Sequence, residues 1–211
     1  KADYARKGIA RGRSVVVDHQ KHPGPVLREV LATFDWSHVD GAAVSGRLSR
    51  SVQLPRIPTK QAQAHGFRFL FGDQPATVVN IGSHGFSVLE LREGGLEVLR
   101  ENSRCSQGTG NFLRQLTGRF NLTPADASEL CAEVEHAAPL SGRCPVILKT
   151  DMTHLANKGG DRASILAGLF DAVCENVMVL VKPGISPERV ALFGGVTRSR
   201  RVQRTLARML S

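Results

Sequence analysis

The sequence is poor in aromatic residues, with one Trp, one Tyr and nine Phe among its 211 residues. So few rings provide no obvious platform on which the bases of a nucleic acid could stack. The chain also lacks a run approaching the roughly 20 apolar residues of a membrane-spanning helix. Its longest aliphatic stretch, residues 177–181, ends at Lys182 and Pro183, and no apolar signal segment opens the chain. We therefore expect a cytoplasmic protein with no membrane partner.

Cysteine is scarce, and basic residues outnumber acidic ones. The four cysteines form no Cys-x-x-Cys pair, which disfavours a zinc ribbon, and nothing indicates secretion, which disfavours a disulfide framework. The 28 Lys and Arg exceed the 19 Asp and Glu, for a net charge of +9. This balance favours anionic partners such as nucleotides, coenzyme A or nucleic acid. Arginines crowd residues 198–208, so a basic nucleic-acid-binding module is one alternative. Apolar residues interleaved among them instead indicate the solvated face of a helix.

The first 70 residues alternate predicted strands with predicted helices. Residues 14–17 and 41–44 are predicted strands, and residues 25–34 and 59–70 are predicted helices. The first of these helices has Pro in its opening turn, where a missing N–H costs little. Alternation of this kind predicts a parallel or mixed sheet.

The pattern changes at Ala76, where three short strands are predicted around tight, Gly-containing turns, as in a β-meander. Helices and one further strand follow. The three meander strands are predicted over 77–81, 86–91 and 96–100, the later helices over 109–120, from Pro124, over 161–181 and over 198–210, and the last strand over 189–193. We expect two domains, a first lobe over residues 1–75 and a second lobe over residues 76–211.

The cysteines fall into two classes. Cys131 and Cys174 occupy apolar positions of predicted helices, and free cysteines are commonly buried in this way. Cys105 and Cys144 lie instead in polar segments, each directly after an arginine. Both are either ligating sulfurs or plain surface thiols. Two thiolates do not complete a cubane iron–sulfur cluster, which takes four, but a two-fold dimer would present each cysteine twice.

Residues 102–113 read NSRCSQGTGNFL. This segment resembles the Cys-x-x-Gly-Thr-Gly-x-Phe-Leu signature of the BadF/BadG/BcrA/BcrD-type ATPases. That family comprises activators of 2-hydroxyacyl-CoA dehydratases and ATPase subunits of benzoyl-CoA reductase. Cys144 lies where the family places its second cluster ligand, and residues 194–196, Gly-Gly-Val, resemble the family's adenosine-side loop. The resemblance runs from about residue 24 to residue 208.

The resemblance implies an α/β protein of the actin–hexokinase, ribonuclease H-like fold. It also implies a homodimer in which Cys105 and Cys144 of both subunits hold one [4Fe–4S] cluster, with ATP or ADP and Mg²⁺ as the nucleotide ligand. Such an activator passes a low-potential electron to an acyl-CoA dehydratase or reductase component. Backbone N–H groups at the helix start after Gly108 would cradle phosphate. The nucleotide-binding residues implied in this way are Gly82, Ser83, Gly108, Thr109, Gly110, Asn111, Gly194, Gly195 and Val196.

The sequence departs from the family pattern at the phosphate turn. The family's Asp-Ile-Gly-Gly-Gln-Asp motif appears here as residues 80–85, NIGSHG. Asn80 and Gly85 thus replace two carboxylates that would hold Mg²⁺-bound water and align the attack. The family's opening β-hairpin and its closing strand and helix are also missing, so we expect a fold truncated at both ends.

These departures leave two alternatives within the same fold. One is a degenerate domain, as in one half of a tandem protein, that binds nucleotide without hydrolysing it. The other is a sugar or carboxylate kinase of the same superfamily, which would need an acidic base near the phosphate turn. Asn80 and Gly85 remove the obvious candidates for that base.

Overall fold

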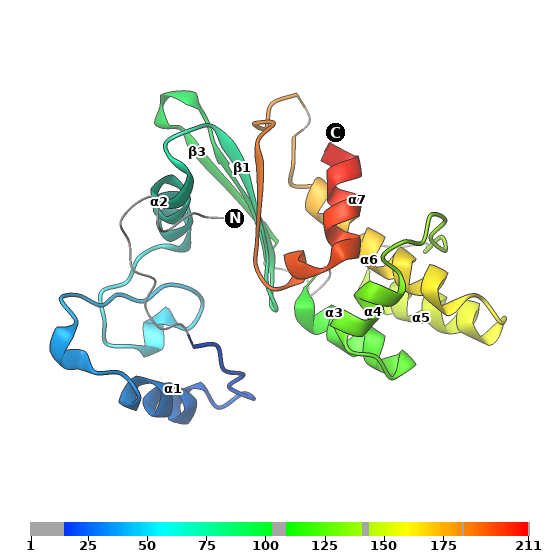
Figure 1. Ribbon diagram of the computed structural model, residues 1–211, viewed down its shortest axis with the longest axis horizontal. Coiled ribbons are helices and arrows are strands. Elements are labelled where there is room, and N and C mark those ends of the chain that lie inside the picture. The colour runs from blue at the N-terminus through cyan, green and yellow to red at the C-terminus, as the bar shows by residue number, and fades with distance from the viewer. Residues whose placement is uncertain (1–14, 103–108, 141–143, 183, 211) are drawn as a thin grey trace. The chain divides into compact units, whose positions relative to one another are not determined.

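The computed structural model describes residues 15–102, 109–140, 144–182 and 184–210. The chain divides into two compact units, residues 1–73 and residues 74–211 (Figure 1). Across the described residues, no helix combines the length and the apolar character that crossing a membrane requires.

The first unit contains two α-helices, α1 (Pro23–Ala32) and α2 (Thr59–Phe71), and both were predicted. The predicted parallel or mixed sheet is absent from the described residues of this unit. In the described part of this unit, β-structure amounts to one isolated bridge between Val44 and Arg56. The sheet prediction for the first 70 residues was therefore wrong. Short β-prone segments become strands only when neighbouring strands pair with them, and residues 15–17 and 41–43 find no such neighbour here.

The second unit is built on a four-stranded sheet, ordered β3-β2-β1-β4. The strands β1 (Ala76–Ile81), β2 (Phe86–Leu91) and β3 (Glu97–Asn102) form the predicted antiparallel meander. The last strand, β4 (Val190–Phe193), runs parallel to β1, with Val79 opposite Leu192. Because β1 and β4 run in the same direction, the turn that follows β1 and the glycine pair that follows β4 emerge at the same end of the sheet.

Five helices gather on one side of this sheet (Figure 1). They are α3 (Gly110–Thr117), α4 (Pro124–Leu130), α5 (Pro145–Asn157), α6 (Arg162–Met178) and α7 (Arg200–Leu210). Alternate residues of β1 and β2, such as Val79 and Val88, pack against them in one apolar core. The long helix α6 contributes most of the buried side chains, including Leu166 and Phe170.

Three of these helices begin at side-chain caps. The oxygens of Thr109, Thr123 and Asp161 each accept a hydrogen bond from the backbone N–H three residues further on. Such a cap satisfies one of the N–H groups that a helix start leaves without an intrahelical partner. The predicted starts at Thr123 and Asp161 are confirmed.

Helix α5 was not predicted, and its sequence explains why. Leu148 and Met152 are its fully buried side chains, four residues apart, while Val146 and Ile147 are exposed. Apolar residues therefore occur on both sides of the helix, and the 3.6-residue periodicity that identifies a helix is weak.

The arginines of α7 were predicted to form its solvated face, and Arg201 contradicts this. Its side chain is 6% exposed and forms two hydrogen bonds with Asp171 of α6, at 2.9 and 2.5 Å. Arg200 and Arg204 do lie at the surface, where they pair with Glu133, just beyond the end of α4. These three arginines thus connect α7 to α6 and to the segment after α4, and carboxylates of the same chain balance their charge.

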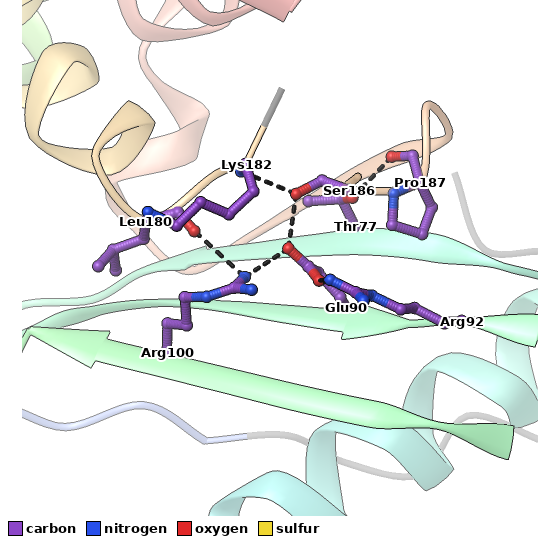
Figure 2. Close-up of polar contacts among 8 residues, drawn as sticks. All are labelled: Thr77, Glu90, Arg92, Arg100, Leu180, Lys182, Ser186 and Pro187. Carbon is purple, nitrogen blue, oxygen red and sulfur yellow. Dashed lines mark hydrogen bonds and ion pairs between the residues drawn. The ribbon is translucent and has the colours of Figure 1, made fainter. Parts of the chain in front are cut away.

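A second buried charge lies on β2, at the end of the sheet away from the turn that follows β1. Figure 2 shows the carboxylate of Glu90 between Arg92 and Arg100, with the Ser186 hydroxyl donating to it at 2.5 Å. Arg100 also donates to the carbonyl of Leu180, at 3.3 Å. Burial would raise the pKa of Glu90, but the hydrogen bonds from Arg100, Ser186 and Arg92 outweigh it and lower the pKa to about 2. Glu90 therefore ties the segment before β4 to the sheet in its ionised form.

We predict that Glu90→Gln destabilises the second unit at neutral pH by about 3 kcal/mol, because it leaves the half-buried guanidinium groups of Arg92 and Arg100 without their buried counter-charge. Since the folded-state pKa lies below the ordinary value of 4.5, the ionised carboxylate stabilises the fold above that value, and this contribution is lost as the pH falls toward 2. Urea unfolding at pH 7 and at pH 3, followed by circular dichroism, should show the variant and wild type converging at the lower pH. Glu101→Gln, at an exposed position of β3, is the control and should change stability by less than about 0.5 kcal/mol. A constant difference across this pH range would contradict the prediction.

Candidate functional site

The turn between β1 and β2 is the first part of the candidate site. The N–H of Gly82 donates to the carbonyl of Gly85 at 2.8 Å, which closes the tight turn predicted over residues 82–85. Ser83 and His84 are exposed at its tip, and their side chains are hydrogen-bonded, with Oγ and Nδ1 2.8 Å apart. For the described residues, no protein oxygen accepts the backbone N–H of Ser83 or His84. Two adjacent N–H groups are thus available to an anion.

The start of α3 packs directly on this turn. Gly110 donates its N–H to the carbonyl of Gly82 at 2.9 Å, and Asn111 donates to the carbonyl of Ser83 at 3.0 Å. The N–H of Phe112 is taken by the side chain of Thr109. The N–H groups of Gly110 and Asn111, at the helix start that was expected to cradle phosphate, thus have carbonyl acceptors in the turn after β1. These two hydrogen bonds hold the turn in place.

Gly110 owes its identity to this packing. A Cβ atom there would lie 3.3 Å from Cα of Ser83 and 3.3 Å from Cγ2 of Val196. The α3 start, the turn after β1 and the loop after β4 therefore meet at a position where a Cβ would make unusually tight contacts.

The loop after β4 supplies the third part of the site. Gly194 has φ of +92°, a conformation that favours glycine, and a Cβ there would lie 2.3 Å from the carbonyl oxygen of Ile81. It would also lie 2.7 Å from the side-chain oxygen of Asn80. Gly195 has ordinary angles and open space around it. Gly194 is thus required because the end of β4 lies so close to β1, whereas Gly195 is not.

These segments surround a cavity of about 430 Å³, within the size range of small-molecule sites. Four of the predicted residues line it, namely Ser83, Gly110, Gly195 and Val196. Gly82, Thr109, Asn111 and Gly194 lie beside it and fix its walls, whereas Gly108 falls outside the described residues. The structure therefore brings together parts of the chain more than 100 residues apart that the sequence had singled out separately.

The rest of the cavity wall was not predicted as part of a site. Apolar residues from α3, α4 and α6 line it, among them Leu113, Ala125 and Phe170. Ser128 and Ser199, hydrogen-bonded to each other at 2.7 Å, join α4 to the start of α7 beside these residues. The sequence marked Thr123-Pro124 as a helix start, but no signal in it indicated that α4 would face the glycine loops.

The cysteines divide as the sequence predicted, as far as the structure describes them. Cys131 and Cys174 are fully buried. Burial raises the pKa of the Cys131 thiol to about 12, and burial also raises the pKa of Cys174. Both thiols therefore stay protonated at neutral pH, in a state that does not bind metal.

Cys144 is exposed and occupies the N-cap position of α5, while Cys105 lies outside the described residues. In the part of the chain that the structure describes, no three His, Cys, Asp or Glu side chains gather as a metal site. The Cys144 thiol is therefore open to contact from outside the described chain.

Comparison with known proteins identifies the relatives of this chain. The sequence profile of the BadF/BadG/BcrA/BcrD ATPase family matches residues 34–211. The chain belongs to this family. One curated relative is the (R)-2-hydroxyglutaryl-CoA dehydratase activating ATPase of Acidaminococcus fermentans, which is 27% identical over 123 residues. These residues make up 58% of this chain and 47% of the relative. The activator of lactoyl-CoA dehydratase from Anaerotignum propionicum is 26% identical over 166 residues, 78% of this chain and 64% of the relative.

The chain thus spans about half to just under two thirds of the length of these two family members. A solved structure, the activator of 2-hydroxyisocaproyl-CoA dehydratase from Clostridium difficile with bound ADPNP, superposes with a TM-score of 0.78. The alignment covers 89% of this chain and 72% of that one, at 22% identity. This likeness confirms the predicted α/β fold of the actin–hexokinase type.

We predict that Gly194→Ala destabilises the second unit by about 2 kcal/mol or more, because it combines a positive φ with a clash against the carbonyl of Ile81. The neighbouring Gly195→Ala is the matched control. Its Cβ meets no atom within 4 Å, so it should leave stability within about 1 kcal/mol of wild type. Thermal unfolding of the two variants measures the difference. Equal stability of both would show that the approach of β4 to β1 is looser than the structure indicates.

Proposed function

We propose that this chain is the nucleotide-binding part of an ATP-dependent activator of an acyl-CoA dehydratase or reductase. The observation that carries the proposal is the cavity in which the phosphate turn, the start of α3 and the Gly194-Gly195 loop converge. Family membership supports the same assignment, and relatives bear the names of activators and of an activating ATPase.

The proposed ligand is ATP or ADP with Mg²⁺. The exposed N–H groups of Ser83 and His84 would meet phosphate oxygens. The apolar wall beyond them, with Ala125 and Phe170, would accept the base. The likeness to a relative solved with bound ADPNP supports this choice of ligand.

The residues present fit nucleotide binding better than they fit hydrolysis. Asn80 and Gly85 stand where the family signature carries carboxylates, and an amide or a hydrogen atom gives Mg²⁺ and water no negative charge. A domain that binds nucleotide and turns it over slowly is therefore the second candidate. The two candidates share one site and differ in rate.

We predict that ADP binds while wild-type ATP turnover is slow, and that Asn80→Asp combined with Gly85→Asp raises turnover at least tenfold. The backbone at Gly85 tolerates a side chain, since its Cβ would sit 3.5 Å from the carbonyl of Asn102 in ordinary contact. Calorimetry measures ADP binding, and phosphate release measures turnover. Glu93→Asp, at an exposed position beyond the opposite end of the sheet from the turn after β1, is the control and should leave both unchanged. Failure of wild type to bind ADP would contradict the nucleotide site, and fast wild-type turnover would contradict the role given to Asn80 and Gly85.

We further propose that Cys144 and Cys105 of two subunits hold a [4Fe–4S] cluster, which supplies the low-potential electron passed to the partner enzyme. The exposed position of Cys144 at the start of α5 supports this, because the thiol is accessible to a second subunit. Cys105 enters the proposal through the resemblance of its sequence segment to the family signature.

We predict about four irons per dimer after anaerobic reconstitution, and almost none in Cys144→Ser or Cys105→Ser. Each substitution removes two of the four ligands, because a two-fold axis repeats it. Cys131→Ser and Cys174→Ser are the matched controls. They should lower stability by about 1–3 kcal/mol, since a polar hydroxyl replaces a more apolar thiol in the core, and leave iron content unchanged. An iron-free wild type, or iron loss in either control, would contradict the assignment of ligands.

A further inference from the structure

We propose that Ser83 is a phosphoryl acceptor, taking the γ-phosphoryl group of ATP with His84 as the base. The inference rests on the proposed nucleotide site and adds an activity to it. It comes from one contact, the hydrogen bond between Oγ of Ser83 and Nδ1 of His84 at 2.8 Å, formed at the tip of the phosphate turn.

A hydroxyl bonded to an imidazole is the pairing that turns a weak nucleophile into a reactive one. When the His84 ring carries its proton on Nε2, Nδ1 accepts the hydrogen bond from the Ser83 hydroxyl. Both side chains are exposed, and Ser83 lines the cavity. The hydroxyl therefore has a base on one side and open space for a ligand on the other.

Contacts with the start of α3 hold the backbone of Ser83 in place. Its carbonyl accepts the N–H of Asn111 at 3.0 Å, and its Cα lies against Gly110. The bond from Gly82 N to Gly85 O closes the turn around it. A nucleophile fixed in this way loses little conformational entropy when it reaches a bound phosphate.

The other hydroxyls that line the described cavity have structural partners. Thr123 accepts the N–H of Asp126 and donates to its carboxylate at 2.7 Å, which accounts for it as the cap of α4. Ser128 and Ser199 bond to each other, and Ser199 also accepts the N–H of Val202. Among these hydroxyls, Ser83 is the one that an imidazole contacts.

The lost carboxylates make a hydroxyl a better acceptor than water in this site. Asn80 and Gly85 provide no base to activate a water molecule. Glu129 is the carboxylate among the described lining residues, but it belongs to α4 and pairs with Arg200 at 3.5 Å. The base next to the phosphate turn is His84, and its contact is with Ser83.

In the proposed step, Oγ of Ser83 forms a bond to the γ-phosphorus of ATP while the bond from that phosphorus to the β,γ-bridging oxygen breaks. The hydroxyl proton passes to Nδ1 of His84. ADP leaves with the electron pair of the broken bond, and the products are ADP and phosphorylated Ser83. The N–H groups of Ser83 and His84, which have no acceptor among the described residues, are placed to meet the charge on the phosphate oxygens.

The test is incubation of the chain with ATP and Mg²⁺, followed by intact-mass measurement and fragmentation to locate the phosphate. We expect one phosphoryl group per chain, on Ser83, at a first-order rate that does not depend on protein concentration. Ser83→Ala should abolish the modification. His84→Ala should slow it at least 100-fold, the size of a typical general-base contribution, and added free imidazole should restore part of the rate. Such rescue distinguishes a base from a residue that merely shapes the turn.

Thr150→Ala, which alters an exposed hydroxyl on α5, is the control and should be modified like wild type.

Binding of ADP, measured by calorimetry on the same samples, separates this inference from the proposed function. ADP binding without a phosphoryl group on Ser83 overturns the inference alone, as does phosphate at another residue or unchanged modification in Ser83→Ala. Absence of ADP binding overturns the nucleotide site and the inference with it.

Discussion

The close packing of three segments at Gly110 is the constraint on which the candidate site depends. The turn after β1, the start of α3 and the loop after β4 come within van der Waals distance there, and the contact is sealed by two main-chain hydrogen bonds, from Gly110 to Gly82 and from Asn111 to Ser83. Glycine suits this position because a Cβ would lie 3.3 Å from both Cα of Ser83 and Cγ2 of Val196. The cavity is the space that remains beside this junction, so its shape follows from the junction.

Charge plays a different part in the fold. Glu90 and Asp171 are carboxylates that arginines hold in place, with Arg100 reaching Glu90 from β3 and Arg201 reaching Asp171 from α7. Glu90 joins the segment before β4 to the sheet, at the end away from the turn after β1. Asp171 joins α7 to α6. A basic protein of net charge +9 thus uses several of its arginines internally. This is why the arginine-rich C-terminal helix is weak support for a nucleic-acid interface.

The sequence was sufficient to predict most of the second unit and little of the first. Strand alternation and Gly-containing turns predicted the meander, and side-chain caps predicted the starts of α4 and α6, because these signals are local. The first 70 residues carried the same kind of signal, yet strands need partners, and pairing is not encoded in a four-residue segment. Helix α5 was not predicted because its apolar residues lie on two faces. In the site, the sequence predicted the glycines but not the cavity wall formed by Ala125, Ser128 and Phe170. That wall depends on how α4 and α6 pack against loops far away in the sequence, and local patterns do not show such packing.

The residues of the site differ in what they indicate about function. Gly110 and Gly194 are explained by packing alone, so their presence would be expected in this fold with or without a ligand. Cys131 and Cys174 are likewise explained by the core. Ser83, His84 and Cys144 differ from these, because each is exposed and the packing of the described chain makes no demand for its particular chemistry. A hydroxyl–imidazole pair beside a phosphate turn and a thiol at a helix start bear on what the protein does, whereas the glycines bear on how the site is built. The nucleotide assignment therefore depends on the cavity that the glycines shape, whereas the chemistry proposed beyond binding depends on those three side chains.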